Sequence, residues 1–261
     1  MNLIDSTIIS SEVISYNYLL FTVETNHNGF LGDPGQFYEI QYTDDLSKLR
    51  IPISIYDQTD HKISFLIKII GSKTQKLALL KPNDPLRLIG PLGKGFSSPL
   101  KKSNILLLTG GIGYAPLYYF SKSVSIEHSL FWIHGGKNRE EVSIAIRDQK
   151  TDMIFTDDGS FGKLGFVTKE LQPIIQQYKI NLVYACGPEP MLISVQSICQ
   201  AQKIKLYLSL EAYMACGIGA CFGCAVKMKD HEHIYYGRVC TDGPVFASEK
   251  VILSDQGYNN I

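Results

Sequence analysis

Four cysteines near the C-terminus constrain this chain more than any other feature. Cys216, Cys221 and Cys224 are separated by four and two residues, and Cys240 follows fifteen residues further on. This is the spacing of plant-type [2Fe-2S] sites, in which four thiolates hold two irons. Several glycines among these cysteines let the backbone fold tightly and point N–H groups at sulfur. The pattern predicts a [2Fe-2S] cluster with these four cysteines as its ligands.

Three other uses of the cysteines fit the pattern less well. Structural zinc sites usually combine two short Cys or His hooks, and only Cys221 with Cys224 form one, although His231 and His233 could complete a site. Disulfides are typical of secreted chains, whereas residues 1–7 lack the basic start and apolar core of a secretory signal. A Rieske centre needs two histidines at ligand spacing. We therefore favour the [2Fe-2S] cluster, with zinc as the main alternative.

Charge and hydropathy restrict the class of protein. Lysine plus arginine and aspartate plus glutamate both number 25, so the formal net charge is zero. A nucleic-acid-binding surface would need a basic excess, so we expect no nucleic-acid partner. The chain contains no apolar run near the roughly 20 residues of a membrane span, so we expect a cytoplasmic protein without a membrane partner. In that reducing compartment, Cys186 and Cys199 should be free thiols.

The first hundred residues have the pattern of an antiparallel β-barrel. Short β-prone runs, clearest at 19–23, 36–41 and 63–69, are separated by turn signals. Pro52 lacks a backbone N–H and therefore predicts an edge strand. Gly71-Ser72-Lys73-Thr74 opens a helix expected over 74–80. Such a helix start can bind phosphate, but it can equally be a plain helix cap.

The middle of the chain alternates between strands and helices. A buried strand at 105–109 runs into Gly110-Gly111-Ile112-Gly113 and a helix at 114–122, and the alternation continues to a strand at 205–209. This predicts a parallel sheet with ligands bound beyond the carboxyl ends of its strands. A second strand end carries Cys186-Gly187-Pro188. The two loops together predict a dinucleotide site, although Pro116 replaces the third glycine of the full fingerprint. The segment 156–160, with two aspartates, either contacts a ribose or forms a simple turn.

Three motifs resemble the ferredoxin–NADP reductase superfamily: Pro34-Gly35-Gln36-Phe37, the run from Gly110 to Pro116, and the run from Ala185 to Met191. The tail narrows the resemblance. Ser209-Leu210-Glu211, the stretch 214–221 and the stretch 240–246 are similar to electron-transfer subunits of B-type dihydroorotate dehydrogenase. The resemblance covers nearly the whole chain.

That family implies FAD, one [2Fe-2S] cluster and NAD. Its flavin motif, Arg-Pro-x-Ser, falls on Ile51, Pro52, Ile53 and Ser54, and further flavin contacts fall on Leu66, Ile67, Lys68, Lys73 and Thr74. The predicted NAD residues are Gly110, Gly111, Gly113, Pro116, Cys186, Gly187 and Pro188. Two positions depart from the family, because Ile51 replaces its arginine and Lys73 replaces a glycine. Either FAD is held more weakly, or Lys68 and Lys73 supply the missing charge.

The resemblance also implies three domains and a route for electrons. We expect an FAD-binding β-barrel over 1–98, an NAD-binding α/β domain over 99–206 and a [2Fe-2S] subdomain over 207–261. Nicotinamide exchanges electrons in pairs and the cluster singly, so a flavin is expected between them. Electrons would start on an FMN-containing catalytic subunit that oxidises dihydroorotate in pyrimidine biosynthesis. The two kinds of subunit are expected to form a hetero-oligomer, a heterotetramer. No catalytic acid–base residue is predicted.

Two alternatives remain open at this point. The chain could be the reductase subunit of another complex, such as a ferredoxin:NAD(P) oxidoreductase or a hydrogenase-linked reductase, because these share the same architecture. It could also be a zinc-stapled, nucleotide-binding module without redox activity.

Overall fold

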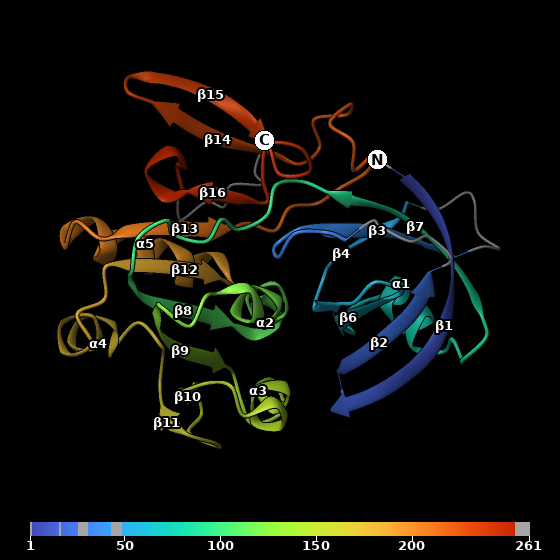
Figure 1. Cartoon of the computed structure of the whole chain (residues 1–261), viewed down its shortest axis with the longest axis horizontal. Helices are drawn as coiled ribbons and strands as arrows, with labels where there is room; N and C mark the ends of the chain where they lie inside the picture. The colour runs from blue at the N-terminus through green and yellow to red at the C-terminus, as the bar shows by residue number, and fades with distance from the viewer. Residues whose placement is uncertain (1, 16, 26–30, 43–48, 254–261) are drawn as a thin grey trace.

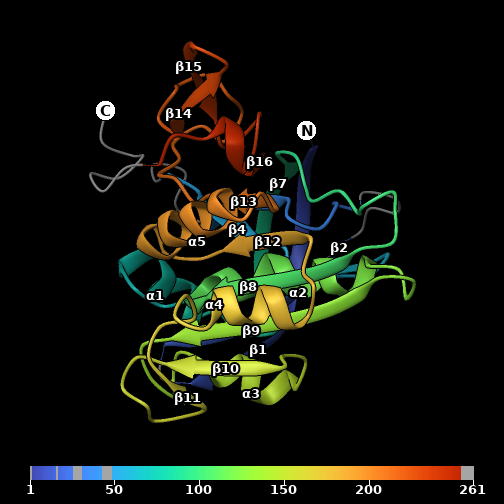
Figure 2. The ribbon, with the colours of Figure 1, turned by 90° about the vertical axis from the view of Figure 1, so that its left-hand side faces the viewer.

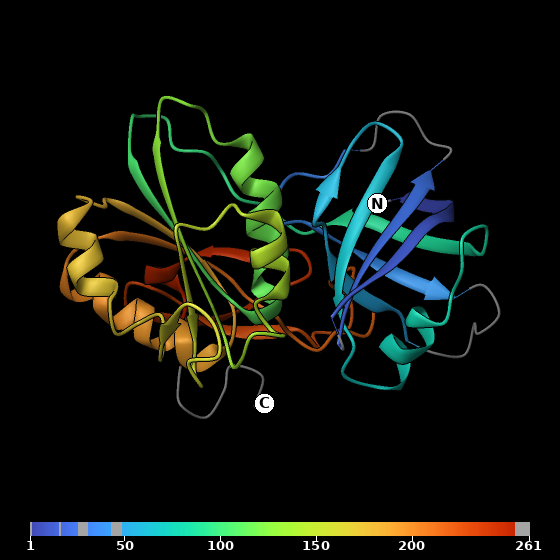
Figure 3. The same cartoon turned by 90° about the horizontal axis from the view of Figure 1, so that it is seen from below.

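The computed structural model describes residues 2–15, 17–25, 31–42 and 49–253. Its N-terminal part is a curved antiparallel sheet that rolls into a half-barrel (Figures 1 and 3). The hydrogen-bonded order is β4-β3-β7-β1-β2-β6-β5. The strands are β1 (Asn2–Ser15), β2 (Tyr18–Thr25), β3 (Phe37–Tyr42), β4 (Ile51–Ser54), β5 (Asp57–Gln58), β6 (Lys62–Lys68) and β7 (Pro85–Leu92).

Alternation along these strands separates a buried face from an exposed one. In β2, Leu19, Phe21 and Val23 are fully buried in the barrel core, whereas Glu24 is exposed. Strand β4 is an edge strand, as Pro52 predicts, because proline cannot donate to a second neighbour. Helix α1 (Ser72–Ala78) lies at one end of the half-barrel, close to the helix predicted over 74–80.

The second sheet is parallel apart from its last strand. Its order is β11-β10-β9-β8-β12-β13-β16. The strands are β8 (Asn104–Gly110), β9 (Ser129–Gly136), β10 (Met153–Thr156), β11 (Lys163–Leu164), β12 (Leu182–Cys186), β13 (Lys205–Ser209) and β16 (Val245–Ala247). The helices are α2 (Tyr114–Ser123), α3 (Ser143–Asp148), α4 (Leu171–Gln177) and α5 (Glu189–Ala201). This confirms the predicted parallel sheet.

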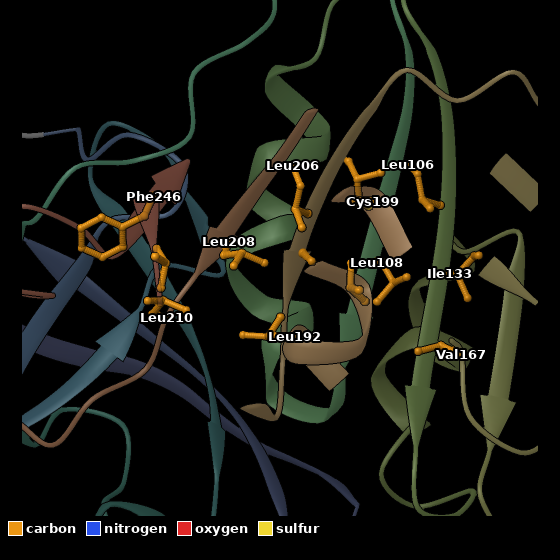
Figure 4. Packing of buried hydrophobic residues seen from close by; sticks show 14 of the residues in the cluster. Leu106, Leu108, Ile133, Val167, Leu192, Cys199, Leu206, Leu208, Leu210 and Phe246 are labelled. Carbon is orange, nitrogen blue, oxygen red and sulfur yellow. The ribbon is translucent and has the colours of Figure 1, made fainter. Parts of the chain in front are cut away.

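The helices cover both faces of this sheet, which explains why its central strands are apolar throughout (Figure 2). Residues of α4 and α5 pack with Leu106 and Leu108 on one face, and residues of α2 and α3 pack with Ile105 and Leu107 on the other. Figure 4 shows Leu192 of α5 in the same hydrophobic cluster as Leu106 and Leu108 of β8. Burial of this kind stabilises the sheet by roughly 1.5–3 kcal/mol for each large apolar side chain.

The C-terminal segment is bound to both larger parts. Strands β14 (Ala225–Asp230) and β15 (His233–Arg238) form a hairpin, and β16 pairs antiparallel with β13. Pro244 also forms an isolated bridge with Lys94, just after the half-barrel. The limit proposed at residue 206 falls inside β13, so the chain enters the cluster segment directly from the parallel sheet. No described helix is long and apolar enough to cross a membrane.

Polar and aromatic contacts join the half-barrel to the parallel sheet. Lys122 on α2 donates to Asp57 on β5 at 2.6 Å, and the rings of Tyr56 and Tyr118 stack with centroids 4.3 Å apart. Tyr56 also donates its hydroxyl hydrogen bond to Asp148 at the end of α3. These contacts fix the position of the half-barrel against helices α2 and α3.

Candidate cofactor sites

The four predicted cluster ligands lie in the loop before β14 and just after β15. The Sγ atoms of Cys224 and Cys240 are 3.2 Å apart, and both residues are buried. Cys216 and Cys221 form a second interacting pair, in which Cys221 is exposed. Two pairs of sulfur atoms match a cluster in which each iron takes two thiolates. Among the described residues, no three His, Cys, Asp or Glu side chains surround a single metal-ion position.

The environment of the sulfurs favours thiolates on the open side of the site. Burial raises the pKa of Cys216, but backbone N–H groups of Ile218, Cys221 and Ala220 outweigh it and lower that pKa to about 6. Burial and the neighbouring Cys224 thiol raise the pKa of Cys240 to about 12. Because iron binds the thiolate, Cys216 is prepared for metal, whereas Cys224 and Cys240 are held by their packing. The donor set therefore fits a [2Fe-2S] cluster.

Two glycines allow the loop around Cys216 to adopt its tight course. Gly217 and Gly219 have φ angles of +68° and +82°, a region that residues with a Cβ rarely adopt. A Cβ on Gly217 would lie 2.8 Å from the Glu39 side chain. Glu39 is only 1% exposed, and its desolvation raises its pKa to about 7 despite the nearby Arg50 cation. The cluster loop therefore packs directly on β3 of the half-barrel.

A cavity of about 680 Å³ opens at the carboxyl ends of the parallel strands. Its walls include the glycines at the ends of β8, β9 and β12, together with residues of β6, α5 and the loop after β11. The volume lies within the range of about 300–1,000 Å³ that small-ligand sites occupy. It is therefore large enough to hold much of a nucleotide cofactor.

The two predicted glycine loops lie against each other at the base of this cavity. A Cβ on Gly187 would lie 2.9 Å from the backbone nitrogen of Gly110, and one on Gly113 would lie 2.3 Å from the carbonyl oxygen of Cys186. No side chain fits between the loops, so they pack backbone against backbone. Gly110, Gly111, Gly187 and Pro188 line the cavity.

The other predicted NAD residues lie behind the cavity wall. Gly113 and Pro116 are buried at the start of α2, and Cys186 is buried at the end of β12. Burial raises the pKa of the Cys186 thiol well above its ordinary range, so it stays protonated. Cys199 is likewise a buried free thiol, as predicted. The roles of these residues stay predictions.

Charged and aromatic residues that the sequence patterns did not single out as ligands also line the cavity. They are Lys137, Glu141, Phe166 and Glu211, and they accompany the aspartate Asp157. Desolvation raises the pKa of Glu211, and the Lys68 cation partly opposes this effect. One available signal was Gly135-Gly136, a second Gly-Gly pair at a strand end, which marks where the segment carrying Lys137 and Glu141 begins.

The residues predicted to bind FAD surround the end of the half-barrel near α1. Ile51 is 9% exposed and belongs to the barrel core, so an arginine there would have to extend through this packing. Arg50 lies on the opposite face and donates from Nε to Gln41. The neighbouring Pro52, Ile53 and Ser54 are half-buried along β4. The missing family arginine is therefore not replaced by Arg50 on the same face.

The remaining predicted flavin contacts come from β6 and α1. Leu66 is buried against residues of the parallel-sheet domain, and Ile67 is buried in the half-barrel core. Lys68 lines the cavity. The Thr74 hydroxyl accepts hydrogen bonds from the backbone N–H groups of Ile70 and Gly71. These bonds form the plain helix cap, which the sequence analysis gave as the alternative to a phosphate site. Lys73 Nζ donates to the carbonyl of Leu49. The space in front of Gly71 is open, so cations and free room for a flavin phosphate are both present here.

Comparison with known proteins identifies the family. A model of the iron–sulfur cluster binding domain of dihydroorotate dehydrogenase B matches residues 211–252. A dihydroorotate dehydrogenase B (NAD(+)) electron transfer subunit from Clostridium acetobutylicum is 37% identical over 225 residues, which cover 85% of this chain and 87% of that protein. A second, from Fusobacterium nucleatum, is 34% identical over 263 residues, which cover 96% and 99%. This chain belongs to the family of dihydroorotate dehydrogenase B electron transfer subunits.

Solved structures of reductases share the fold of this chain. The structure of an NADH-dependent reduced ferredoxin-NADP oxidoreductase, described for its insights into flavin-based electron bifurcation, matches with a TM-score of 0.83 and 25% identity over 95% of this chain and 90% of its own. A ferredoxin NADP+ reductase from Neisseria gonorrhoeae with bound FAD and NADP shares the fold, with a TM-score of 0.66 and 15% identity over 77% and 92%. The predicted family, fold class and cofactor set are confirmed.

Proposed function

We propose that this chain carries electrons from the catalytic subunit of a two-subunit dihydroorotate dehydrogenase to NAD+. One observation carries the proposal: a four-cysteine site and a glycine-lined nucleotide cavity flank the same half-barrel. Gly217 of the cluster loop packs on Glu39 of β3, and Lys68 of β6 reaches into the cavity. The half-barrel therefore connects a site for single electrons with a site for a hydride acceptor.

The residues that would bind the three cofactors lie in three separate parts of the structure. Cys216, Cys221, Cys224 and Cys240 would hold the [2Fe-2S] cluster, and the N–H groups around them stabilise the thiolates. The backbone of the Gly110 and Gly187 loops would bind the nucleotide diphosphate, and Asp157, which lines the cavity, would accept a hydrogen bond from a ribose hydroxyl. The residues of β4 and α1, together with the backbone of Leu66, Ile67 and Lys68 on β6, would hold FAD, while the Lys68 ammonium faces the nucleotide cavity.

When bound, these groups supply complementary chemistry: the cluster carries electrons singly, the flavin exchanges them singly or in pairs, and NAD+ accepts a hydride. The protein's own contribution is to hold and orient them. Hydride transfer needs no general acid or base, which agrees with the protonated, buried Cys186 at the cavity wall.

The proposed partner is an FMN-containing subunit that oxidises dihydroorotate, in a heterotetramer in the cytoplasm. Both relatives described above carry the name of an electron transfer subunit, which supports a separate catalytic subunit. Cys221 is exposed, so the cluster edge that it would hold is open to a partner. We also propose the limits 1–98, 99–206 and 207–261 for the FAD, NAD and cluster regions.

Reconstitution tests this function. The purified chain should oxidise NADH with artificial acceptors but should not oxidise dihydroorotate. With its co-expressed catalytic subunit, it should form NADH from NAD+ when dihydroorotate is added. Co-purification from native cells would identify the partner, and its mass would give the number of subunits.

The likeness to an NADH-dependent ferredoxin-NADP oxidoreductase favours one competing function, a reductase in a different complex. The same preparation should therefore be assayed with reduced ferredoxin as the donor. NAD(P)+ reduction by ferredoxin, together with no activity on dihydroorotate in the presence of the co-purified partner, would replace the proposed function with this one.

A further inference from the structure

An ion pair inside the nucleotide cavity joins the half-barrel to the parallel-sheet domain. Lys68 Nζ on β6 lies 2.6 Å from Glu141 Oε1, in the segment between β9 and α3. The two side chains are 24% and 13% exposed, so the pair is largely shielded from water. Both residues line the cavity, together with Gly110 and Gly111.

Other contacts hold the Glu141 carboxylate in place. Its second oxygen, Oε2, accepts a hydrogen bond from the N–H of Lys137 at 3.2 Å. Its own backbone N–H donates to Asn138 Oδ1 at 3.1 Å. The segment that bears Glu141 is therefore folded around this carboxylate, which is fixed before any ligand arrives. Lys68 is the partner that can move, because a lysine side chain is long and flexible.

The charge balance of the cavity makes this pair significant. Three carboxylates, Glu141, Asp157 and Glu211, face two lysines, Lys68 and Lys137. A nucleotide diphosphate adds further negative charge, and a cation that can approach it strengthens its binding. With Lys68 bound to Glu141, one of the two cavity lysines is already paired.

We propose that Glu141 is a positioning residue that withholds Lys68 from the nucleotide diphosphate and so keeps the affinity of the cavity for NAD and NADH low. The inference rests on the proposed nucleotide site. Apparent affinity falls in proportion to the fraction of molecules in the binding-competent state, here the state with Lys68 released. A weaker hold on the nucleotide favours rapid exchange of NADH for NAD+ after each turnover, because affinity differences within one site lie mostly in the dissociation rate.

The test is a double-mutant cycle with ADP-ribose, which carries the diphosphate but no nicotinamide. Isothermal titration calorimetry is done on the chain loaded with its cluster and FAD. Glu141→Gln removes the charge but keeps an oxygen for the N–H of Lys137, so the segment should stay folded. We expect it to bind ADP-ribose about fivefold more tightly, at the lower end of measured coupling between linked groups. The KM for NADH should fall with it.

The matched variants separate charge release from a general disturbance. Lys68→Met should weaken ADP-ribose binding, and Glu141→Gln should have no further effect in the Lys68→Met background. Glu140→Gln is the control, because Glu140 is the exposed neighbour in the same segment. It should bind ADP-ribose as the parent chain does.

The proposal is overturned if Glu141→Gln leaves the ADP-ribose affinity unchanged or weakens it, or if the gain persists without Lys68. It is also overturned if Glu141→Gln changes the FAD content instead, because Lys68 would then serve the flavin. A parent chain that binds no ADP-ribose at saturation would instead refute the nucleotide site itself, a result that the parent titration alone reveals.

Discussion

His134 should make the nucleotide-binding domain sensitive to acid. The side chain is fully buried on β9, directly before the glycines that line the cavity. Its Nδ1 lies 2.9 Å from the Thr109 hydroxyl, which also accepts a hydrogen bond from the Trp132 indole. Burial lowers the pKa of His134 from 6.5 to about 4, although contacts with Glu141 and Thr109 partly oppose it.

The sign and size of the effect follow from linkage. The unfolded chain takes up a proton on this histidine below pH 6.5, whereas the folded chain does not until about pH 4. Stability from the neutral ring is therefore complete above pH 6.5 and is lost as the pH falls towards 4. At about 1.4 kcal/mol for each unit of pKa shift, roughly 2 kcal/mol is lost at about pH 5 and roughly 3 kcal/mol at about pH 4.

The assay compares thermal unfolding of the parent chain with that of His134→Gln, followed by circular dichroism between about pH 8 and pH 5. The substitution lowers Tm at every pH, because it disturbs the buried network. Its Tm should nevertheless fall less on acidification than that of the parent, by about 4–8 °C over this interval. His61→Gln, at an exposed position, should keep the parent slope. Parallel curves for the parent and His134→Gln would refute the reasoning.

Three further predictions address the sites themselves. Cys221→Ser should lose the cluster, which would be seen as loss of iron and acid-labile sulfide. It should also stop dihydroorotate-driven NADH formation, while reduction of artificial dyes by NADH persists. If dihydroorotate still drove NADH formation in this variant, the cluster would not lie on the path of the electrons. Asp157→Ser should raise the KM for NADH by about 5- to 30-fold and improve use of NADPH, because it removes a ribose acceptor and a charge that repels a 2′-phosphate; an unchanged NADH/NADPH preference would contradict this role. Gly113→Ala should destabilise the chain by about 1–3 kcal/mol, because the new Cβ would meet the Cys186 carbonyl oxygen. Gly71→Ala is the control and should leave Tm unchanged, because the space in front of Gly71 is open. Equal Tm values for the two variants would disprove this packing argument.

Local patterns predicted the elements of this fold because propensity and tertiary packing agree in them. Strand β13 has the limits predicted for it, and Pro52 predicted an edge strand. The cysteine spacing likewise predicted four residues that the fold brings together as two sulfur pairs. In each case the signal lies within a few residues of sequence.

Contacts between distant segments could not be predicted in this way. Glu39 lies under the cluster loop because β3 packs on Gly217, far along the chain. Lys68 meets Glu141 because the half-barrel docks on the parallel sheet, and no periodicity encodes that docking. Gly113 fits a nucleotide motif by spacing, and Pro116 stands where the third glycine of that motif would be. Both nevertheless lie behind the cavity wall, because the turn that begins α2 places them there.

Transfer of electrons within the isolated chain tests the central claim most directly. The loaded protein is reduced anaerobically with dithionite, freed of excess reductant and mixed with NAD+. Reduced FAD alone supplies the electron pair of one NADH per chain, and the reduced cluster holds one further electron, so two chains together hold a third pair. We expect NADH to exceed one per chain while the electron paramagnetic resonance signal of the reduced cluster falls, and Cys221→Ser should show no cluster signal and form no more than about one NADH per chain. A cluster signal that persists in excess NAD+, with NADH limited to about one per chain, would contradict the proposed path.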